Sequence, residues 1–406
     1  MKSIFISLWG NPERWNVTRY SFNSKTCESI TSSRVIYENF KTDYCIIYIP
    51  NSIYPGIYKD DTYLSQYQDL INSKLCEFLN SKDTESAEFY KNSNKIIFPS
   101  KGSFTADNKN YIFDFDINYI YSYFYRSILN YLESVDKINK IIVDITHGIN
   151  FLEFIFLESL MYALRVYALS NKIDVNIEYY NSDPYSNFAI LNIYKIKSIE
   201  IEYKNVLSII SRDFINMYRH NKKDIKDYFK LNFNEDLSDY IKACSIMAQS
   251  VTVPYLMYLI INIYKKIYEI GSGGLEVHLN IEDNKIRQTF DNKINVNIET
   301  LAFLDTLIKI NSSIKYDNGF KIPDIYTFTD NFFSRESYNI FIKNELRKIK
   351  SKKEHYDFDI GNFSRNFKAY AGLLDGLYVL KDNSIDFKTF HFQNQKIDLN
   401  WIVKNI

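Results

Sequence analysis

The chain has 406 residues, of which 46% are hydrophobic and 24% are charged. Both fractions are typical of folded proteins, and the length indicates two domains of about 100–200 residues each rather than a disordered chain. The 49 basic residues balance the 49 acidic ones. No global charge therefore attracts nucleic acid, and any such binding must come from a local basic patch.

The first half of the chain alternates strand and helix patterns. Apolar or alternating runs that end in turns predict strands at Ser3–Trp9, Val17–Phe22, Tyr44–Pro50, Lys95–Pro99, Lys140–Thr146, 173–180 and 187–196. Helical spacing of apolar residues predicts helices at 60–81, 116–136 and 150–171. Strands separated by helices predict a parallel sheet with helices on both faces.

From about residue 200 the pattern becomes mainly helical. Helices are predicted at 201–230, 236–268, 298–312, 335–350 and 362–373. A β-hairpin near 275–298 is predicted to be inserted among these helices. The predicted fold class is an α/β domain over residues 1–198 followed by a mainly helical domain over residues 199–406.

The segment between Lys242 and Lys265 contains no charged residue. Its length is near the 20 or so residues that cross a bilayer, so a membrane span is one interpretation. Its several polar residues and its central Pro254 favour a buried helix pair or a kinked helix instead.

Cysteine and histidine spacing gives no sign of a metal site or a disulfide framework. The four cysteines include no CxxC pair, and the five histidines form no HExxH motif. The N-terminal apolar run is short and lacks a small-residue cleavage site, so no signal peptide is predicted. These patterns predict a reducing, cytoplasmic location.

In parallel α/β sheets, ligands bind beyond the carboxyl ends of the strands. One such loop runs through Thr146-His147-Gly148 into a predicted helix near Asn150. A glycine lets the backbone approach a ligand, and a helix N-terminus offers free N–H groups to phosphate. The chain has no GxGxxG or GxxxxGK[ST] motif, which disfavours dinucleotides and ordinary nucleoside triphosphates. Alternatively, Thr146 and Asn150 only cap the helix, and His147 satisfies a buried hydrogen bond.

Three loops together resemble the CARF–HEPN ribonucleases of type III CRISPR systems. They are Trp9-Gly10-Asn11-Pro12 with Arg14-Trp15 just after, the loop Pro99…Gly102…Phe104, and Asp144-Ile145-Thr146-His147-Gly148-Ile149-Asn150. That family joins a Rossmann-like CARF sensor domain to a helical HEPN effector domain. The resemblance implies a CARF domain at 1–198 and a HEPN domain at 199–406.

In that family the matching loops of two protomers form a symmetric pocket for a cyclic oligoadenylate, most often the tetra-adenylate. The resemblance implies that this ring acts as an allosteric activator, with no cofactor and no membrane, in a homodimer or an assembly of dimers. The implied ligand-binding residues are Trp9, Gly10, Asn11, Pro12, Arg14, Lys101, Gly102, Thr146, His147, Gly148, Ile149 and Asn150.

Residues 362–373 resemble the HEPN effector motif, Arg-x4-His followed by Ala-Gly. Tyr370 stands where that family has histidine, so the implied catalytic residues are Arg365, Asn366 and Tyr370. Arg365 presents a charged fork that fits phosphate. A tyrosine hydroxyl has a reference pKa of about 10 and is a poor base at pH 7. We therefore expect a slow nuclease or an effector that no longer cuts; alternatively, these are ordinary packing residues.

The run Lys343–Lys353 carries six positive charges against one acid. It is predicted to guide an RNA backbone, or else to form a solvated helix face. The residues expected to guide RNA are Arg347, Lys348 and Lys350. His220 is predicted to lie on a solvated basic face together with Arg219, Lys222 and Lys223.

The resemblance thus implies a cyclic-oligoadenylate-activated, metal-independent endoribonuclease that cuts single-stranded RNA in type III CRISPR antiviral defence. Two alternatives follow from Tyr370. One is a catalytically impaired sensor that binds the cyclic ligand. The other is a CARF domain that itself cuts the ring.

Overall fold

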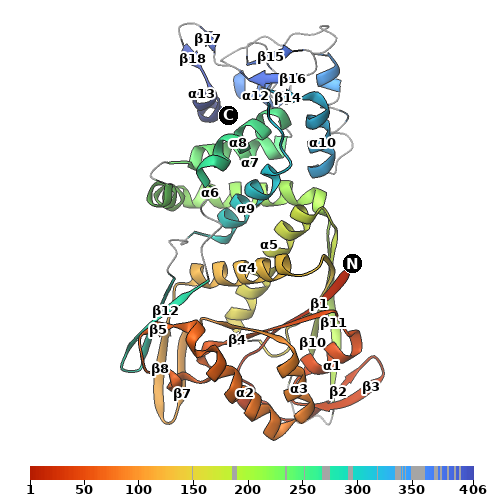
Figure 1. The fold of residues 1–406 in the computed structure, drawn as a ribbon, viewed down its shortest axis with the longest axis vertical. Coiled ribbons are helices and arrows are strands. Elements are labelled where there is room, and N and C mark those ends of the chain that lie inside the picture. Colours follow the sequence, from red (N-terminus) through yellow and green to blue (C-terminus); the bar gives the residue numbers. More distant parts are fainter. Residues whose placement is uncertain are drawn as a thin grey trace. The chain divides into compact units, whose positions relative to one another are not determined.

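The computed structural model divides the chain into two compact units, shown in Figure 1. Unit 1 comprises Met1–Tyr167, Ile173–Ile201 and Gly273–Ile298, and unit 2 comprises Ala168–Lys172, Glu202–Ser272 and Glu299–Ile406. The structure describes residues 1–148, 150–184, 190–233, 236–250, 252–267, 275–290, 296–317, 319–333, 340, 342, 344–348, 362–369, 374, 377–381, 384–387, 390–392 and 395–406.

Unit 1 is built on an eight-stranded sheet with the strand order β3-β2-β11-β10-β9-β1-β4-β6. Its strands are β1 (Lys2–Leu8), β2 (Thr18–Phe22), β3 (Lys25–Ser29), β4 (Tyr44–Pro50), β6 (Asn94–Phe98), β9 (Ile138–Asp144), β10 (Val175–Ser182) and β11 (Leu191–Ile201). All seven strands predicted for this half of the chain are present.

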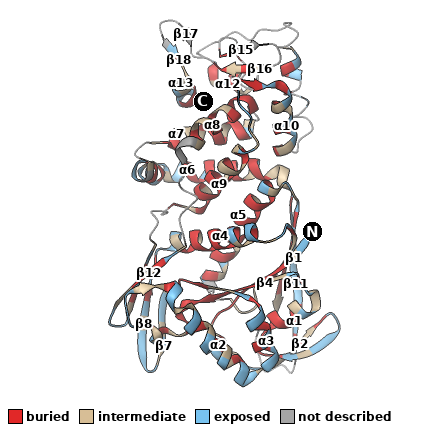
Figure 2. Cartoon of the chain, viewed as in Figure 1, coloured by how far each residue is buried: buried red, intermediate tan, exposed pale blue. Residues whose placement is uncertain are grey.

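The five strands from β10 to β6 are parallel, as predicted. Ile6 of the central strand β1 faces Ile46 of β4 and Val143 of β9. Such strands are covered on both faces and read as continuous apolar runs. Figure 2 shows this buried centre of the sheet. The expectation of a parallel sheet was wrong at the other edge, where β11 is antiparallel to β10 and β2 and β3 form a hairpin.

Helices cover both faces of this sheet (Figure 1). The chain moves from β1 through β4 to β6, then returns to β9 and β10 on the other side of β1. Because crossovers are right-handed, this reversal puts the connecting helices on opposite faces and leaves a switch point between β1 and β9. The elements are η1 (Pro12–Arg14), α1 (Ser32–Phe40), η2 (Asn51–Ile53), η3 (Pro55–Ile57), η4 (Leu64–Tyr67), α2 (Gln68–Lys82), α3 (Thr84–Asn92), α4 (Ile117–Ser134) and α5 (Asn150–Asn171).

A second sheet of unit 1 contains the predicted hairpin, but not in the predicted domain. Its strand order is β5-β12-β13-β8-β7. Its strands are β5 (Thr62–Tyr63), β7 (Gly102–Ala106), β8 (Lys109–Asp114), β12 (Val277–Glu282) and β13 (Lys285–Phe290). The hairpin pairs through β12 with β5 and through β13 with β8, so assigning it to the helical domain was wrong. Local alternation reveals strands but does not tell which distant strands they pair with.

A buried polar network joins this hairpin to the end of the main sheet. The Asn51 Nδ2 atom donates to Gln288 Oε1 at 2.8 Å, and Gln288 Nε2 donates to the Ser100 carbonyl oxygen at 2.6 Å. The Ser100 N–H donates to Asn51 Oδ1 at 2.9 Å, which closes the ring of contacts. Gln288 is only 4% exposed. Its amide therefore specifies where the hairpin docks, since each buried polar group is satisfied.

Unit 2 is mainly helical, with short strands near the C-terminus. Its elements are α6 (Tyr203–Phe233), α7 (Ser238–Ser250), α8 (Val253–Ile267), α9 (Ile298–Asn311), β14 (Phe320–Lys321), α10 (Ile322–Phe332), α12 (Phe363–Ala369), β15 (Tyr378–Lys381), β16 (Ser384–Phe387), β17 (Phe390–Phe392), β18 (Gln395–Ile397) and α13 (Leu399–Asn405). The first residue of α9 is grouped with unit 1.

The uncharged segment between Lys242 and Lys265 lies in a helix pair, α7 and α8. Pro254 occupies the first turn of α8, where its missing N–H breaks no helical hydrogen bond. Leu256, Leu259 and Ile260 are buried. The prediction of a buried helix pair is confirmed. Among the residues that the structure describes, none of the helices is both long enough and apolar enough to cross a membrane.

Candidate functional site

A cavity of 360 Å³ opens in unit 1 at the switch point of the main sheet. Its walls come from the loops after β1, β9 and β10, together with residues of the β2 and β11 edge. The lining residues are Arg14, Trp15, Asn16, Tyr20, Ile30, Thr146, His147, Asn181, Ser182, Asp183, Pro184 and Leu191. The volume lies within the range of small-molecule sites.

Asp144, at the end of β9, organises the floor beneath this cavity. Its carboxylate accepts hydrogen bonds from the Ser32 hydroxyl at 2.9 Å and the Ser33 hydroxyl at 2.6 Å. It also accepts from the N–H of Thr146 at 3.0 Å and from the Thr146 hydroxyl at 2.6 Å. Asp144 is fully buried, so these donors replace the water that its charge would otherwise require. The carboxylate thereby holds the start of α1 and the loop after β9 together.

His147 forms part of the cavity wall in a defined orientation. Its ring stacks on Trp15 with centroids 4.1 Å apart. Its Nε2 atom lies 3.3 Å from the Ser32 N–H, which donates to it, so we assign the ring proton to Nδ1. Burial lowers the pKa of His147 to about 4 and outweighs the opposite effect of Asp144. The imidazole is therefore neutral at pH 7.

The remaining polar groups give the cavity mixed chemistry. Arg14 is exposed and supplies a cation. Asp183 accepts from the N–H of Asn192 at 2.8 Å, and this bond is the main reason that the pKa of Asp183 lies below its ordinary value. The aromatic ring of Trp15 and the amide of Asn181 complete a surface suited to a planar, hydrogen-bonding ligand.

The structure brings three of the predicted ligand-binding residues to the cavity: Arg14, Thr146 and His147. It does not bring Trp9 there. The Trp9 side chain is fully buried, and its Nε1 donates to the Ser33 hydroxyl at 2.9 Å. Pro12 is also buried. Both side chains belong to the core beneath the loop and do not line the cavity, so their contacts with a ligand stay a prediction.

Other predicted ligand-binding residues have structural roles. The Gly10 N–H donates to the His147 carbonyl at 2.7 Å, and the Asn11 side chain caps η1. Lys101 donates to the Phe115 carbonyl at 2.7 Å. Neither Lys101 nor Gly102 lines the cavity; they lie at the start of the β7–β8 hairpin.

The last part of the loop after β9 is described only in part. A Cβ added to Gly148 would meet Glu153 Oε2 at 2.6 Å, so a side chain there would displace Glu153. Asn150 is the first residue of α5. Ile149 lies outside the described residues.

Sequence reasoning missed several lining residues. Residues 181–184 lie at the carboxyl end of β10, which is parallel to β9, so the rule of carboxyl ends applied to that strand would have found them. Trp15 follows the predicted loop in the sequence but was not among the predicted ligand-binding residues. Tyr20 had no local signal, because its β2 strand reaches the cavity only by pairing with β11.

The predicted effector motif lies partly on α12. Arg365 is exposed on this helix and Asn366 is partly exposed. The opposite face is anchored by Phe363 against Trp401, with ring centroids 4.8 Å apart, and by Phe367 against Tyr255, at 5.0 Å. This packing leaves Arg365 directed toward solvent. Tyr370 lies outside the described residues.

A second cation lies on α12 close to the motif. The pKa of Lys368 is below its ordinary value, first because of burial and second because of the like charge of Lys242. Lys368 follows Arg365 by three residues, so both project from neighbouring turns of one side of the helix. Together they form a positive surface that phosphate would neutralise.

The predicted RNA-guiding run is only partly described. Arg347 is exposed, and Lys348 pairs with Glu345 at 3.3 Å. Lys350 lies outside the described residues. His220 is exposed on α6 beside Arg219, as expected for a solvated basic face. Within the described ranges, no group of three or more His, Cys, Asp or Glu residues is placed to hold a metal ion.

Two comparisons relate the chain to known proteins. Residues 4–184 match the family described as CRISPR system endoribonuclease Csx1, CARF domain. The chain is also similar to the CRISPR system endoribonuclease Csx1 of Methanocaldococcus jannaschii, at 23% identity over 98% of this chain and 90% of that protein. The matched family range contains the main sheet except β11 and the first two residues of β1, and it contains most of the residues that line the cavity.

Proposed function

Because the chain belongs to the CARF-containing CRISPR ribonucleases, we propose that it is a cyclic-oligoadenylate-activated, metal-independent endoribonuclease for single-stranded RNA in type III CRISPR defence. Unit 1 senses the ring and unit 2, as a HEPN domain, cuts RNA in the cytoplasm. The observation that carries the proposal is the cavity at the switch point of the matched domain.

The cavity has the groups that a nucleotide ligand requires. The stacked Trp15–His147 pair offers an aromatic wall for a base, and Arg14 offers a cation for phosphate. A cyclic oligoadenylate is larger than one cavity of 360 Å³. The proposal therefore places the ring across the cavities of two protomers in a homodimer, with cyclic tetra-adenylate as the expected activator.

The proposed cleavage site is the exposed side of α12. Cutting RNA without a metal requires the 2′-hydroxyl to be positioned, the phosphorane charge to be stabilised and the leaving oxygen to be protonated. Arg365 supplies a permanent charge for the phosphorane, and Lys368 adds to it. Asn366 and Tyr370 are four residues apart, a spacing that puts side chains on one side of a helix. Arg347, Lys348 and Lys350 are proposed to guide the RNA by electrostatic attraction.

Tyr370 favours a second candidate function, a sensor that binds the ring without cutting RNA. Loss of one general acid–base group typically removes about 10²–10⁴-fold of rate. In a third candidate, the CARF cavity itself cuts the ring. Linear products from cyclic tetra-adenylate would support the third candidate. Their absence would favour the second candidate, the sensor, over the third.

The test is cleavage of a fluorescent single-stranded RNA in EDTA, with and without cyclic tetra-adenylate. Cleavage should depend on the ring, and Arg365→Ala should lower the rate at least about 10²-fold, since it removes the charge that stabilises the phosphorane. Arg19→Ala is the matched control, because Arg19 is an exposed arginine of unit 1 outside the cavity. Tyr370→His should raise the rate by about 10²-fold or more.

The outcomes separate the candidates. An inert native protein whose Tyr370→His variant cuts on addition of the ring would support the silent sensor. Cleavage that needs added Mg²⁺ would contradict metal independence. Absence of ring binding would contradict the proposal as a whole.

A further inference from the structure

One side of α6 carries a regular row of basic residues. They follow the alternating spacing of four and three residues that keeps side chains on one side of a helix. The row consists of five basic residues and one asparagine, which are Arg212, Asn216, Arg219, Lys223, Lys226 and Lys230. All are exposed except Lys226, which is partly buried. The other side of α6 is packed into unit 2, with Leu207, Ile210 and Phe214 fully buried. The row therefore faces solvent.

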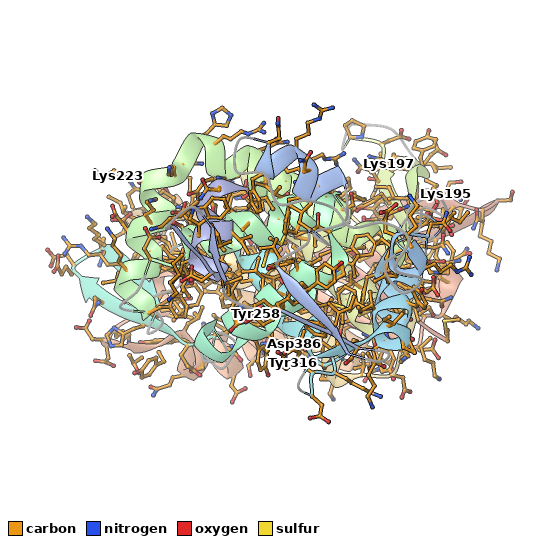
Figure 3. All side chains as sticks on the ribbon, turned by 90° about the horizontal axis from the view of Figure 1, so that it is seen from above. Lys195, Lys197, Lys223, Tyr258, Tyr316 and Asp386 are labelled. Atoms are coloured by element: carbon orange, nitrogen blue, oxygen red, sulfur yellow. The ribbon has the colours of Figure 1, made fainter. Side chains whose placement is uncertain are left out.

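The positive charges of this row are largely uncompensated. Arg212 lies 3.6 Å from its neighbour Asp213, and Lys226 lies 3.4 Å from Asp236. Arg219, Lys223 and Lys230 form no ion pair with another residue that the structure describes. Figure 3 shows Lys223 projecting from the outer side of α6. In a chain with zero net charge, such a row makes a local positive field.

The shape of the row favours an extended polyanion. From Arg212 to Lys230 it spans at most about 27 Å, the length of a straight helix at 1.5 Å per residue. The helix bends at Asn221, whose φ of −120° and ψ of 29° interrupt it between Arg219 and Lys223. The row contains no apolar side chain that would enter a membrane interface and no aromatic ring that would stack on a base. A chain of phosphates matches these features best.

We infer that this row of α6 binds the phosphate backbone of single-stranded RNA, as a substrate-holding surface apart from the cleavage motif. The identity of the polyanion rests on the proposed function. Contacts to phosphate alone carry no sequence information, so the row increases affinity for RNA of any sequence.

The test measures binding of a fluorescein-labelled single-stranded oligouridylate by anisotropy, at 50–300 mM salt and without cyclic tetra-adenylate. One variant combines Arg212→Gln, Arg219→Gln, Lys223→Gln and Lys230→Gln. Each phosphate contact contributes about −0.7 to the slope of log K against log salt for single strands. We expect the four changes to make the slope shallower by about 3 and to weaken binding about 10²-fold at 0.1 M salt.

The matched control removes four exposed lysines of unit 1, as Lys25→Gln, Lys82→Gln, Lys91→Gln and Lys109→Gln. It changes the net charge equally and should leave the salt slope unchanged. Thermal melting of both variants checks that they fold. If the row variant does not fold, the double variant Arg212→Gln with Arg219→Gln replaces it, and the expected change in salt slope is half as large.

Equal loss of RNA binding in the row variant and in the lysine control would overturn the inference, since it would show only an effect of net charge. It would also be overturned if the row variant bound RNA normally and instead lost binding to phosphatidylserine vesicles. RNA binding is read without cleavage. An intact protein that binds RNA through the row but never cuts it would therefore reject the proposed function and retain this inference.

Discussion

His147 shows how one half-buried side chain sets a pH response. Its folded pKa of about 4 lies below the ordinary value of about 6.5. Between these values the unfolded chain takes up a proton that the folded chain does not. The free energy of unfolding should therefore fall as the pH drops from about 6.5 to 4. His147→Asn should remove part of that slope in denaturant titrations measured across this range.

The same residue can be tested directly by nuclear magnetic resonance. The His147 ring should remain neutral at pH 5.5, and Trp15→Ala should raise its pKa because it uncovers the ring to water. The His147→Asn spectrum identifies the resonance. A native ring that titrates near 6.5 would contradict the expected neutral state at pH 5.5.

Lys368 illustrates a conflict between stability and binding on α12. Its lowered pKa means that the folded chain holds this proton less tightly than the unfolded chain does. At pH 7 the charge is present and destabilising, and the penalty disappears only as alkaline pH removes the proton. Lys368→Gln should raise the free energy of unfolding by less than about 1 kcal/mol, since solvent screens a partly exposed charge. It should also weaken RNA binding.

Lys404→Gln is the control for this prediction, because Lys404 is exposed on α13. Urea unfolding and RNA anisotropy are measured on both variants. Lower stability in Lys368→Gln would show that Lys368 contributes favourable packing that outweighs its repulsion from Lys242.

At the scale of elements, the β12–β13 hairpin depends on one buried amide. Gln288→Leu would leave Asn51 Nδ2 and the Ser100 carbonyl without their partner. Each unsatisfied buried group costs about 1–3 kcal/mol, so the two groups should lower the free energy of unfolding by about 2–6 kcal/mol. Amide exchange should accelerate first in β13.

Arg287→Gln is the matched control, because Arg287 is exposed on the same strand and pairs with the exposed Glu282. Its change in unfolding free energy should stay within about 0.5 kcal/mol. Equal effects of the two substitutions on urea unfolding would mean that the polar network does not hold the hairpin.

Some helices could be predicted from local sequence patterns, and others could not. The absence of charge between Lys242 and Lys265, with Pro254 inside, correctly predicted the buried pair α7 and α8. Helices α1 and α3 were missed, although side chains of Thr31 and Asp83 cap them. Both are nine residues long, too short for a clear period of apolar residues.

For the whole molecule, the hairpin makes unit 1 discontinuous in sequence. A fragment of residues 1–201 lacks β12 and β13, so β5 loses its partner β12, β8 keeps only β7, and Asn51 loses Gln288. We expect this fragment to melt at a lower temperature in the absence of a peptide of residues 273–298 than in its presence. Circular dichroism with increasing peptide checks this. A melting temperature that the peptide does not change would show that unit 1 folds without the hairpin.

The sequence by itself determined every strand of the main sheet except β3, the change to helices near residue 200 and the positions of the motif loops, because these depend on local periodicity and turn chemistry. Only the tertiary structure decided which side chains of those loops face the cavity. Trp9 turned into the core while Trp15 stacked on His147, a choice set by packing against distant strands. It also decided that the hairpin completes a sheet of unit 1, because strand pairing joins residues that no local pattern links.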